Sequence, residues 1–341
     1  MSDTGMAPLT SALAGAGVSW DQVASSRAFA GGTFNTVHLV RLVDGTAVVV
    51  KIPPDPAGPV LGYERGILGT EALYYRLAGQ CQGVTVPAVI AVDLTGDAGG
   101  YLVMAECPGS PWPDLTPVPG GGERDELRAE VGRQVARLHT VTGTGFGYPS
   151  LAVGPLRDSW REAFFDMVNA VLADALRFAV TLPRPAADIR DWFVARATAL
   201  DEVATPVLVH FDLWDGNILV ESSSAGRRIG ALIDAERAFW GDPLAEFISL
   251  ALFADIEQDT AFLHGYRSAG GTANFDFAAR QRLLAYRAYL YLIMWVEAVP
   301  RRFTQQRRDW LVDKVFRPLE AIFSDGNHRM TGTADDMEGP R

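Results

Sequence analysis

Apolar and polar positions follow different patterns in the two parts of the chain. In the first part, positions 38–41 and 46–52 have the composition of strands, and Asp44 and Gly45 between them are typical of a hairpin turn. The other elements predicted for this part are a helix over 62–80, with apolar side chains at helical spacing, and strands over 86–92 and 101–105. The first part therefore predicts a small sheet with one long helix.

Beyond residues 108–111, which contain two prolines and a glycine, helical spacing prevails. Strands first and helices after predict an α+β fold with two segregated lobes. We place the first lobe at residues 1–107, a helical lobe at 108–323 and a polar, disordered tail at 324–341. The helices predicted for the second lobe span 123–139, 157–180, 185–203, 243–270 and 276–298, with short strands over 207–209 and 229–233.

The composition narrows the classes of partner. The 341 residues suit two lobes better than one small core. A formal net charge of −11 argues against a nucleic-acid partner. It is compatible with a cationic small-molecule partner, and plain solubility also explains it. No uncharged apolar run reaches about eighteen residues, so no membrane partner is predicted. Cys81 and Cys107 are too few for a disulfide framework, and residues 1–10 lack a secretory pattern, so we expect a cytoplasmic protein.

The densest chemical signal is a polar loop between two apolar runs, over residues 209–220. It holds His210, Asp212 and Asn217, and the last two are five residues apart, which is the spacing of the Asp and Asn in a kinase catalytic loop. Such a loop can place a carboxylate beside an attacking hydroxyl and an amide oxygen beside Mg²⁺. Asp234 ends the next apolar run and supplies a second carboxylate. Since Mg²⁺ prefers oxygen ligands, Asn217 and Asp234 are its predicted ligands.

These segments resemble the aminoglycoside phosphotransferase family, small-molecule kinases related to protein kinases and to choline kinase. The loop matches the family's His-Gly-Asp-x-x-x-x-Asn pattern, and residues 233–236 and 241–243 match its Ile-Asp-x-Glu and Gly-Asp-Pro pieces. The resemblance runs from about residue 25 to about residue 320 and implies a two-lobed, protein-kinase-like fold.

The resemblance also implies roles within the catalytic loop. Asp212 would be the catalytic base, Asn217 and Asp234 would hold Mg²⁺, and His210 would support the loop. Phe211 stands where the family often has Gly. We expect its ring to reshape the loop or to line the acceptor pocket.

In the first lobe, the resemblance implies an ATP site. Lys51 would contact the α- and β-phosphates, oriented by Glu71, which matches the family position better than Glu64. Residues 31–36 resemble the loop that covers the phosphates, where Gly32 would let the backbone approach and Thr33 would add a hydroxyl donor.

The strand at 101–105 and the residues after it resemble the connection between the lobes. Met104 would flank the adenine, and the backbone from Ala105 to Cys107 would bond its edge.

The function implied is transfer of the γ-phosphate of ATP to a hydroxyl of a small molecule, with an antibiotic as the favoured acceptor and resistance as the role. Two alternatives stay open. One is a housekeeping kinase for fructosamine, choline, homoserine or a methylthiopentose, and the other is a catalytically silent nucleotide-binding scaffold. Acids and aromatics that could frame a cationic aminosugar are Trp160, Asp215, Trp240, Asp255, Glu257, Trp295 and Glu297.

Overall fold

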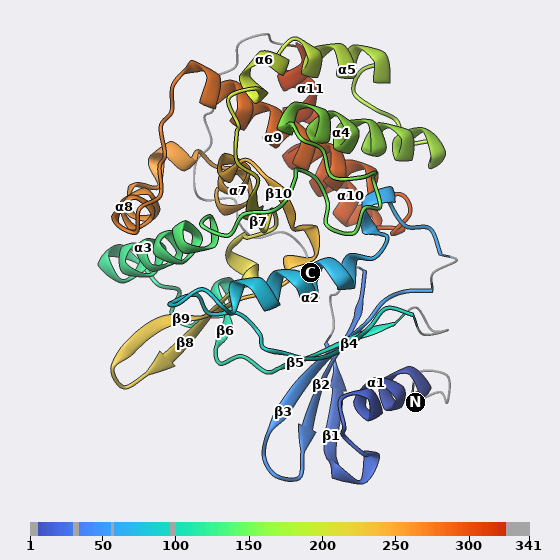
Figure 1. Ribbon diagram of the computed structural model, residues 1–341, viewed down its shortest axis with the longest axis vertical. Coiled ribbons are helices and arrows are strands. Elements are labelled where there is room, and N and C mark those ends of the chain that lie inside the picture. Colours follow the sequence, from blue (N-terminus) through green and yellow to red (C-terminus); the bar gives the residue numbers. More distant parts are fainter. Residues whose placement is uncertain (1–5, 30–33, 56–57, 96–99, 325–341) are drawn as a thin grey trace.

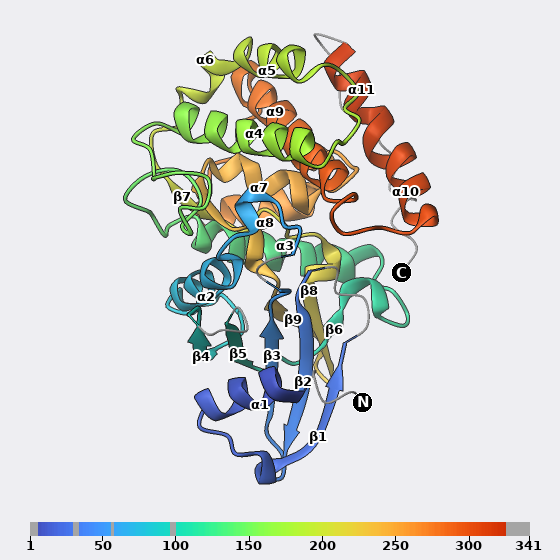
Figure 2. The same ribbon diagram turned by 90° about the vertical axis from the view of Figure 1, so that its right-hand side faces the viewer.

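A computed structural model describes residues 6–29, 34–55, 58–95 and 100–324. A five-stranded antiparallel sheet lies at one end of the molecule and most helices lie at the other (Figures 1 and 2). The strand order is β1-β2-β3-β5-β4. The strands are β1 (Val23–Ala28), β2 (Thr36–Leu42), β3 (Ala47–Ile52), β4 (Val89–Asp93) and β5 (Tyr101–Ala105).

Alternation along β3 gives the sheet two different faces. Val48 and Val50 pack against helix α1 (Met6–Gly15), which lies across the outer face of the sheet (Figure 2). Lys51 lies on the opposite face, where helix α2 (Ile67–Ala78) runs between the sheet and the helical lobe (Figure 1). The strand therefore delivers its one lysine to the boundary between the lobes.

The helical lobe packs around a largely aromatic core. Trp160 stacks on Phe239 with ring centroids 5.6 Å apart, and its indole N–H donates to the hydroxyl of Tyr286 at 2.7 Å. The helices of this lobe are α3 (Gly121–Leu138), α4 (Trp160–Arg177), α5 (Ala186–Val194), α6 (Ala197–Leu200), α7 (Pro243–Leu250), α8 (Thr260–Ser268), α9 (Phe277–Val296), α10 (Gln305–Leu311) and α11 (Arg317–Ser324).

Two small sheets carry the chemistry-bearing loops of this lobe. One pairs β7 (Val207–Val209) with β10 (Phe239–Gly241), and the other joins β6 (Ser110–Pro111), β8 (Ile218–Ser223) and β9 (Gly226–Leu232). The catalytic-loop candidates lie between β7 and β8, and Asp234 follows β9. Two strand ends therefore place both loops on one side of the lobe.

The predicted α+β fold with a sheet lobe and a helical lobe is confirmed. The single helix predicted over 243–270 is wrong: a 3₁₀ turn, η7 (Ile256–Gln258), separates α7 from α8, because Asp255 and Asp259 each cap a new start. The segment 185–203, predicted as one helix, forms the two helices α5 and α6. The segment 62–80, also predicted as one helix, begins with a 3₁₀ turn, η3 (Gly62–Glu64). Strand β8 corresponds to the apolar run that follows the polar loop, whereas helices α1, α10 and α11 and strands β1, β6 and β10 were not predicted.

Within the described ranges, no helix has both the length and the apolar character needed to cross a membrane. Almost all of the predicted tail, residues 325–341, lies outside the described residues.

Candidate active site

Side chains of helix α7 accept backbone N–H groups of the candidate catalytic loop. Glu246 accepts the N–H of His210 at 2.7 Å and that of Phe211 at 3.1 Å, one on each carboxylate oxygen. The hydroxyl of Ser249, one turn further along, accepts the N–H of Leu213 at 3.0 Å. Burial raises the pKa of Glu246 to about 7, and the two backbone bonds oppose that rise. The loop is therefore fixed to a helix that begins with Asp242 as its N-cap and Pro243 in its first turn.

His210 connects the two chemical loops. Its Nδ1 accepts the N–H of Asp212 at 3.3 Å, and its Nε2 lies 2.9 Å from the carbonyl oxygen of Ile233. Burial lowers the pKa of His210 to about 4, so the ring is neutral at pH 7. Since Nδ1 accepts, the single ring proton sits on Nε2 and is donated to Ile233.

Phe211 occupies a backbone conformation that favours glycine, with φ at 61°. Its side chain is fully buried and packs against Phe239 and Tyr289, with ring centroids 5.0 and 5.8 Å away. The expectation that this ring lines an acceptor pocket is wrong, because the ring is part of the core of the helical lobe. The ring instead anchors the strained turn that carries Asp212.

Asp212 and Asn217 are linked within the loop. The amide nitrogen of Asn217 donates to the carbonyl oxygen of Asp212 at 2.7 Å, which leaves the amide oxygen as the atom that would ligate a metal. One carboxylate oxygen of Asp212 lies 3.6 Å from Arg237. Burial raises the pKa of Asp212 to about 7, and the positive charge of Arg237 opposes that rise. A carboxyl group that titrates near neutral pH suits a general base.

Lys51 lies between two carboxylates. Its Nζ is 2.6 Å from Glu71 and 2.5 Å from Asp234. Burial alone would lower the pKa of Lys51, but these two negative charges raise it well above its ordinary value. Glu64, the alternative partner, instead accepts the N–H of Leu61 and pairs with Arg301. Helix α2 therefore brings Glu71, and not Glu64, to the lysine.

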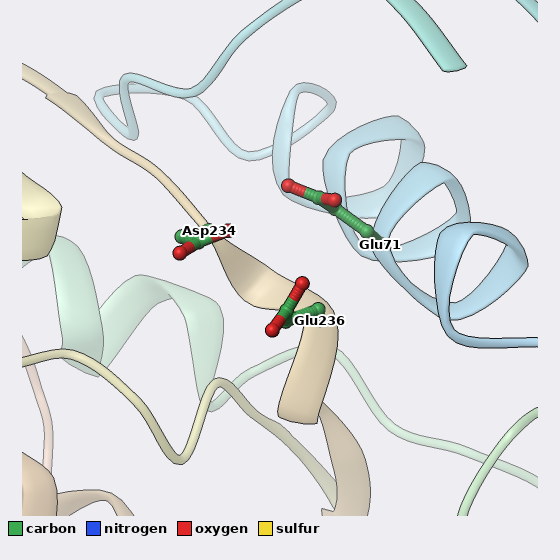
Figure 3. Close-up of side chains that lie close together, drawn as sticks. All are labelled: Glu71, Asp234 and Glu236. Carbon is green, nitrogen blue, oxygen red and sulfur yellow. The ribbon is translucent and has the colours of Figure 1, made fainter. Parts of the chain in front are cut away.

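Three carboxylates gather where α2 meets the segment after β9. Figure 3 shows Glu71 on its helix and Asp234 and Glu236 on the segment opposite. Each offers an oxygen within 4.8 Å of the others, a donor set that fits Mg²⁺. Burial and the nearby charge of Asp234 raise the pKa of Glu236 to about 8. Glu236 also accepts the side-chain N–H of Asn35 at 2.9 Å, a bond between the two lobes.

The residues predicted around the adenine lie along and after β5. Met104 is buried and pairs with Val49 of β3, and Cys107 is half-buried two residues after the strand ends. Burial, with a contribution from Glu106, raises the pKa of the Cys107 thiol to about 11. Gly32 and Thr33, predicted to cover the phosphates, lie outside the described residues.

Several residues expected to frame an aminosugar have structural roles. Trp160 and Trp240 are buried in the helical lobe, Asp215 pairs with the buried Arg128, and Glu297 pairs with Arg237 at 2.9 Å. These four are therefore not free to form an acceptor pocket. Arg237 and Tyr75 also belong to this site and were not predicted, although Arg237 follows Asp234 by three residues and Tyr75 follows Glu71 by one helical turn.

Comparison with known proteins places this geometry in a family. The model of the phosphotransferase enzyme family (APH) matches residues 25–285. A candidate fructosamine-3-kinase from Thermobifida fusca YX-ER1 has a similar structure, with 22% identity, a TM-score of 0.62, and coverage of 89% of this chain and 94% of that one. Comparison with curated proteins gives no match.

Two antibiotic phosphotransferases have similar structures. Macrolide 2′-phosphotransferase MphH from Brachybacterium faecium is 21% identical, with a TM-score of 0.57 and coverage of 90% and 97% of the two chains. A thermostable mutant of aminoglycoside phosphotransferase APH(4)-Ia, solved with ADP and hygromycin B, is 18% identical, with a TM-score of 0.58 and coverage of 92% and 95%. At these identities the structures establish the shared fold, and the family model covers most of the chain. The chain therefore belongs to the phosphotransferase enzyme family and is a small-molecule phosphotransferase.

Proposed function

We propose that this enzyme transfers the γ-phosphate of ATP to a hydroxyl group of a small molecule. The observation that carries the proposal is the position of Lys51 against both Glu71 and Asp234, at 2.6 and 2.5 Å. A phosphate-binding cation, a metal-binding carboxylate and the loop with its base then belong to one site. Related structures were solved with ADP or AMP-PNP, which supports ATP as the donor.

Each side chain has a role in this proposal. Lys51, oriented by Glu71, binds the α- and β-phosphates, and the carboxylate of Asp212 accepts the proton of the attacking hydroxyl. Asn217 and Asp234 would hold Mg²⁺, which when bound neutralises charge on the phosphate oxygens. Glu236 is a further oxygen ligand available beside Asp234.

The rest of the nucleotide site follows the division into lobes. Residues 1–107 would form the nucleotide-binding lobe and residues 108–323 the lobe that carries the acceptor site. Gly32 and Thr33 would cover the phosphates, while Met104 and the backbone at Cys107 would contact the adenine.

For the acceptor, we propose a hydroxylated, sugar-containing antibiotic that carries positive charge. The similar structures named for aminoglycoside and macrolide phosphotransferases support an antibiotic, and the net charge of −11 favours a cation. A fructosamine is the second candidate. It is supported by the structure from Thermobifida fusca and by the run Asp212, Leu213 and Trp214, which resembles that of fructosamine kinases.

An acceptor-dependent ADP-release assay tests the proposal. Wild-type enzyme with ATP and Mg²⁺ is offered aminoglycosides, macrolides, nucleoside antibiotics, fructosamines and metabolic alcohols such as choline and homoserine. We expect one class to raise ADP release, the Asp212→Asn variant to lose that response, and salt to weaken it if the acceptor is cationic. Nucleotide binding without ADP release on any acceptor would instead favour the scaffold alternative.

A further inference from the structure

Four residues of the active site form a closed ring of polar contacts. Lys51 contacts Glu71 at 2.6 Å and Asp234 at 2.5 Å. The hydroxyl of Tyr75 donates to the same oxygen of Glu71 at 2.7 Å and accepts the backbone N–H of Asp234 at 2.7 Å. Lys51 and Tyr75 therefore each bridge Glu71 and Asp234, and the four contacts close a ring. Tyr75 reaches it from α2, four residues after Glu71.

The hydroxyl of Tyr75 meets a strained part of the chain. Asp234 has φ at 65° and ψ at 46°, the left-handed region that non-glycine residues rarely occupy. Such a conformation persists only where surrounding contacts hold it. Lys51 holds the side chain of Asp234, and Tyr75, which is 2% exposed, holds the N–H of the same residue.

We propose that Tyr75 is a positioning residue for metal binding: its hydroxyl fixes the backbone of Asp234 to α2, so that the carboxylate is already in place when Mg²⁺ and nucleotide arrive. The inference rests on the proposed role of Asp234 as a Mg²⁺ ligand. Because the hydroxyl uses its donor on Glu71 and its acceptor capacity on Asp234, it also couples the orientation of the lysine to that of the metal ligand.

The neighbouring residue supplies a matched control. Tyr74 lies on the same helix and is also buried, and among the described residues its hydroxyl has no hydrogen-bond partner. Tyr75→Phe and Tyr74→Phe therefore remove the same atom from adjacent positions of one helix. The first breaks two hydrogen bonds, and the second breaks none that involve a described residue.

Calorimetry with AMP-PNP and increasing Mg²⁺ gives the first readout, without turnover. We expect Tyr75→Phe to raise the Mg²⁺ concentration at half-saturation about tenfold, the effect of a typical lost hydrogen bond, and to leave AMP-PNP binding in EDTA unchanged. Hydrogen exchange of the amide of Asp234 gives the second, and we expect faster exchange in Tyr75→Phe. Tyr74→Phe should match wild type in both measurements.

The outcomes separate the inference from the function on which it rests. An unchanged Mg²⁺ requirement and unchanged exchange at Asp234 in Tyr75→Phe would overturn the inference, even if that variant melts at a lower temperature. Equal changes in Tyr75→Phe and Tyr74→Phe would also overturn it, since the hydroxyl of Tyr75 would then have no special role. If wild type itself binds AMP-PNP without any effect of Mg²⁺, the proposed function fails and the inference fails with it.

Discussion

The guanidinium group of Arg237 lies 3.6 Å from the carboxylate of Asp212 and 2.9 Å from that of Glu297. It therefore places a fixed positive charge beside the residue proposed as the base. Burial drives the pKa of Asp212 up to about 7, and Arg237 limits the rise. The base is thus half ionised near neutral pH, where a proton acceptor is both available and strong enough to act.

Asp212→Asn should lower kcat by about 10²–10⁴-fold, the usual contribution of a general base, while AMP-PNP still binds. In wild type, kcat/KM should rise with pH through about 7, because only the ionised carboxylate accepts the proton. Steady-state kinetics with the acceptor, from pH 5.5 to 8.5, measures both. Near-normal turnover in the variant would remove Asp212 from the mechanism.

Asn217→Ala and Asp234→Ala should each raise the Mg²⁺ concentration needed for activity, because each removes an oxygen ligand. Asn217→Asp is the matched comparison, since it keeps an oxygen at that position while losing the N–H that bonds to Asp212. Titrating Mg²⁺ against initial rate at fixed ATP measures the requirement. The assignment is wrong if both alanine variants show the wild-type requirement.

Phe211 allows a test of backbone strain against core packing. Both Phe211→Ala and Phe211→Gly lose the buried ring, at a cost of about 3–5 kcal/mol, but only glycine relieves the strain at φ 61°. The free energy of unfolding of Phe211→Gly should therefore be about 1 kcal/mol larger than that of Phe211→Ala. Urea denaturation of the two variants measures the difference. Equal stability, or a more stable alanine variant, would show that the backbone there is not strained.

The buried side chain of His139 should make the folded protein less stable in acid. Burial lowers its pKa to about 3, so it stays neutral in the folded protein while the unfolded chain binds a proton below about 6.5. Its contribution is therefore complete above pH 6.5 and is lost as pH falls from 6.5 towards 3. Relative to His139→Phe, wild type should lose about 1.4 kcal/mol of unfolding free energy between pH 7.5 and pH 5.5. A difference that stays constant with pH would contradict this.

The sequence predicted Asp212 and Asn217 from their short-range spacing, and Lys51 and Glu71 from the family resemblance. Asp212 and Asn217 are five residues apart on one loop, and their hydrogen bond closes within it. Tyr75 and Asp234 are 159 residues apart, and Asn35 and Glu236 are 201 apart. A contact between distant residues depends on how the lobes pack, and no local pattern of residue types encodes that.

Residues of the core and residues of a binding pocket are also hard to distinguish from the sequence. Trp160 was a candidate for binding an aminosugar, yet it stacks on Phe239 inside the helical lobe. Apolar spacing predicts that a helix has a buried face but does not say which neighbour covers it. Helix α1 was missed for a related reason: a ten-residue helix without acidic residues in its first turn or basic ones in its last gives little signal by itself, and its stability comes from packing on the sheet.

The segment that matches the family model does not contain all the residues that support the proposed active site. Residues 25–285 match the family model, whereas α1 precedes them and Glu297 and Arg301 follow them. A clone cut to those boundaries would uncover the apolar sheet face at Val48 and Val50, and would remove the acid that pairs with Arg237 beside Asp212. The shared segment therefore holds the proposed reacting groups, while the flanking segments cover the sheet and supply the acid that pairs with Arg237.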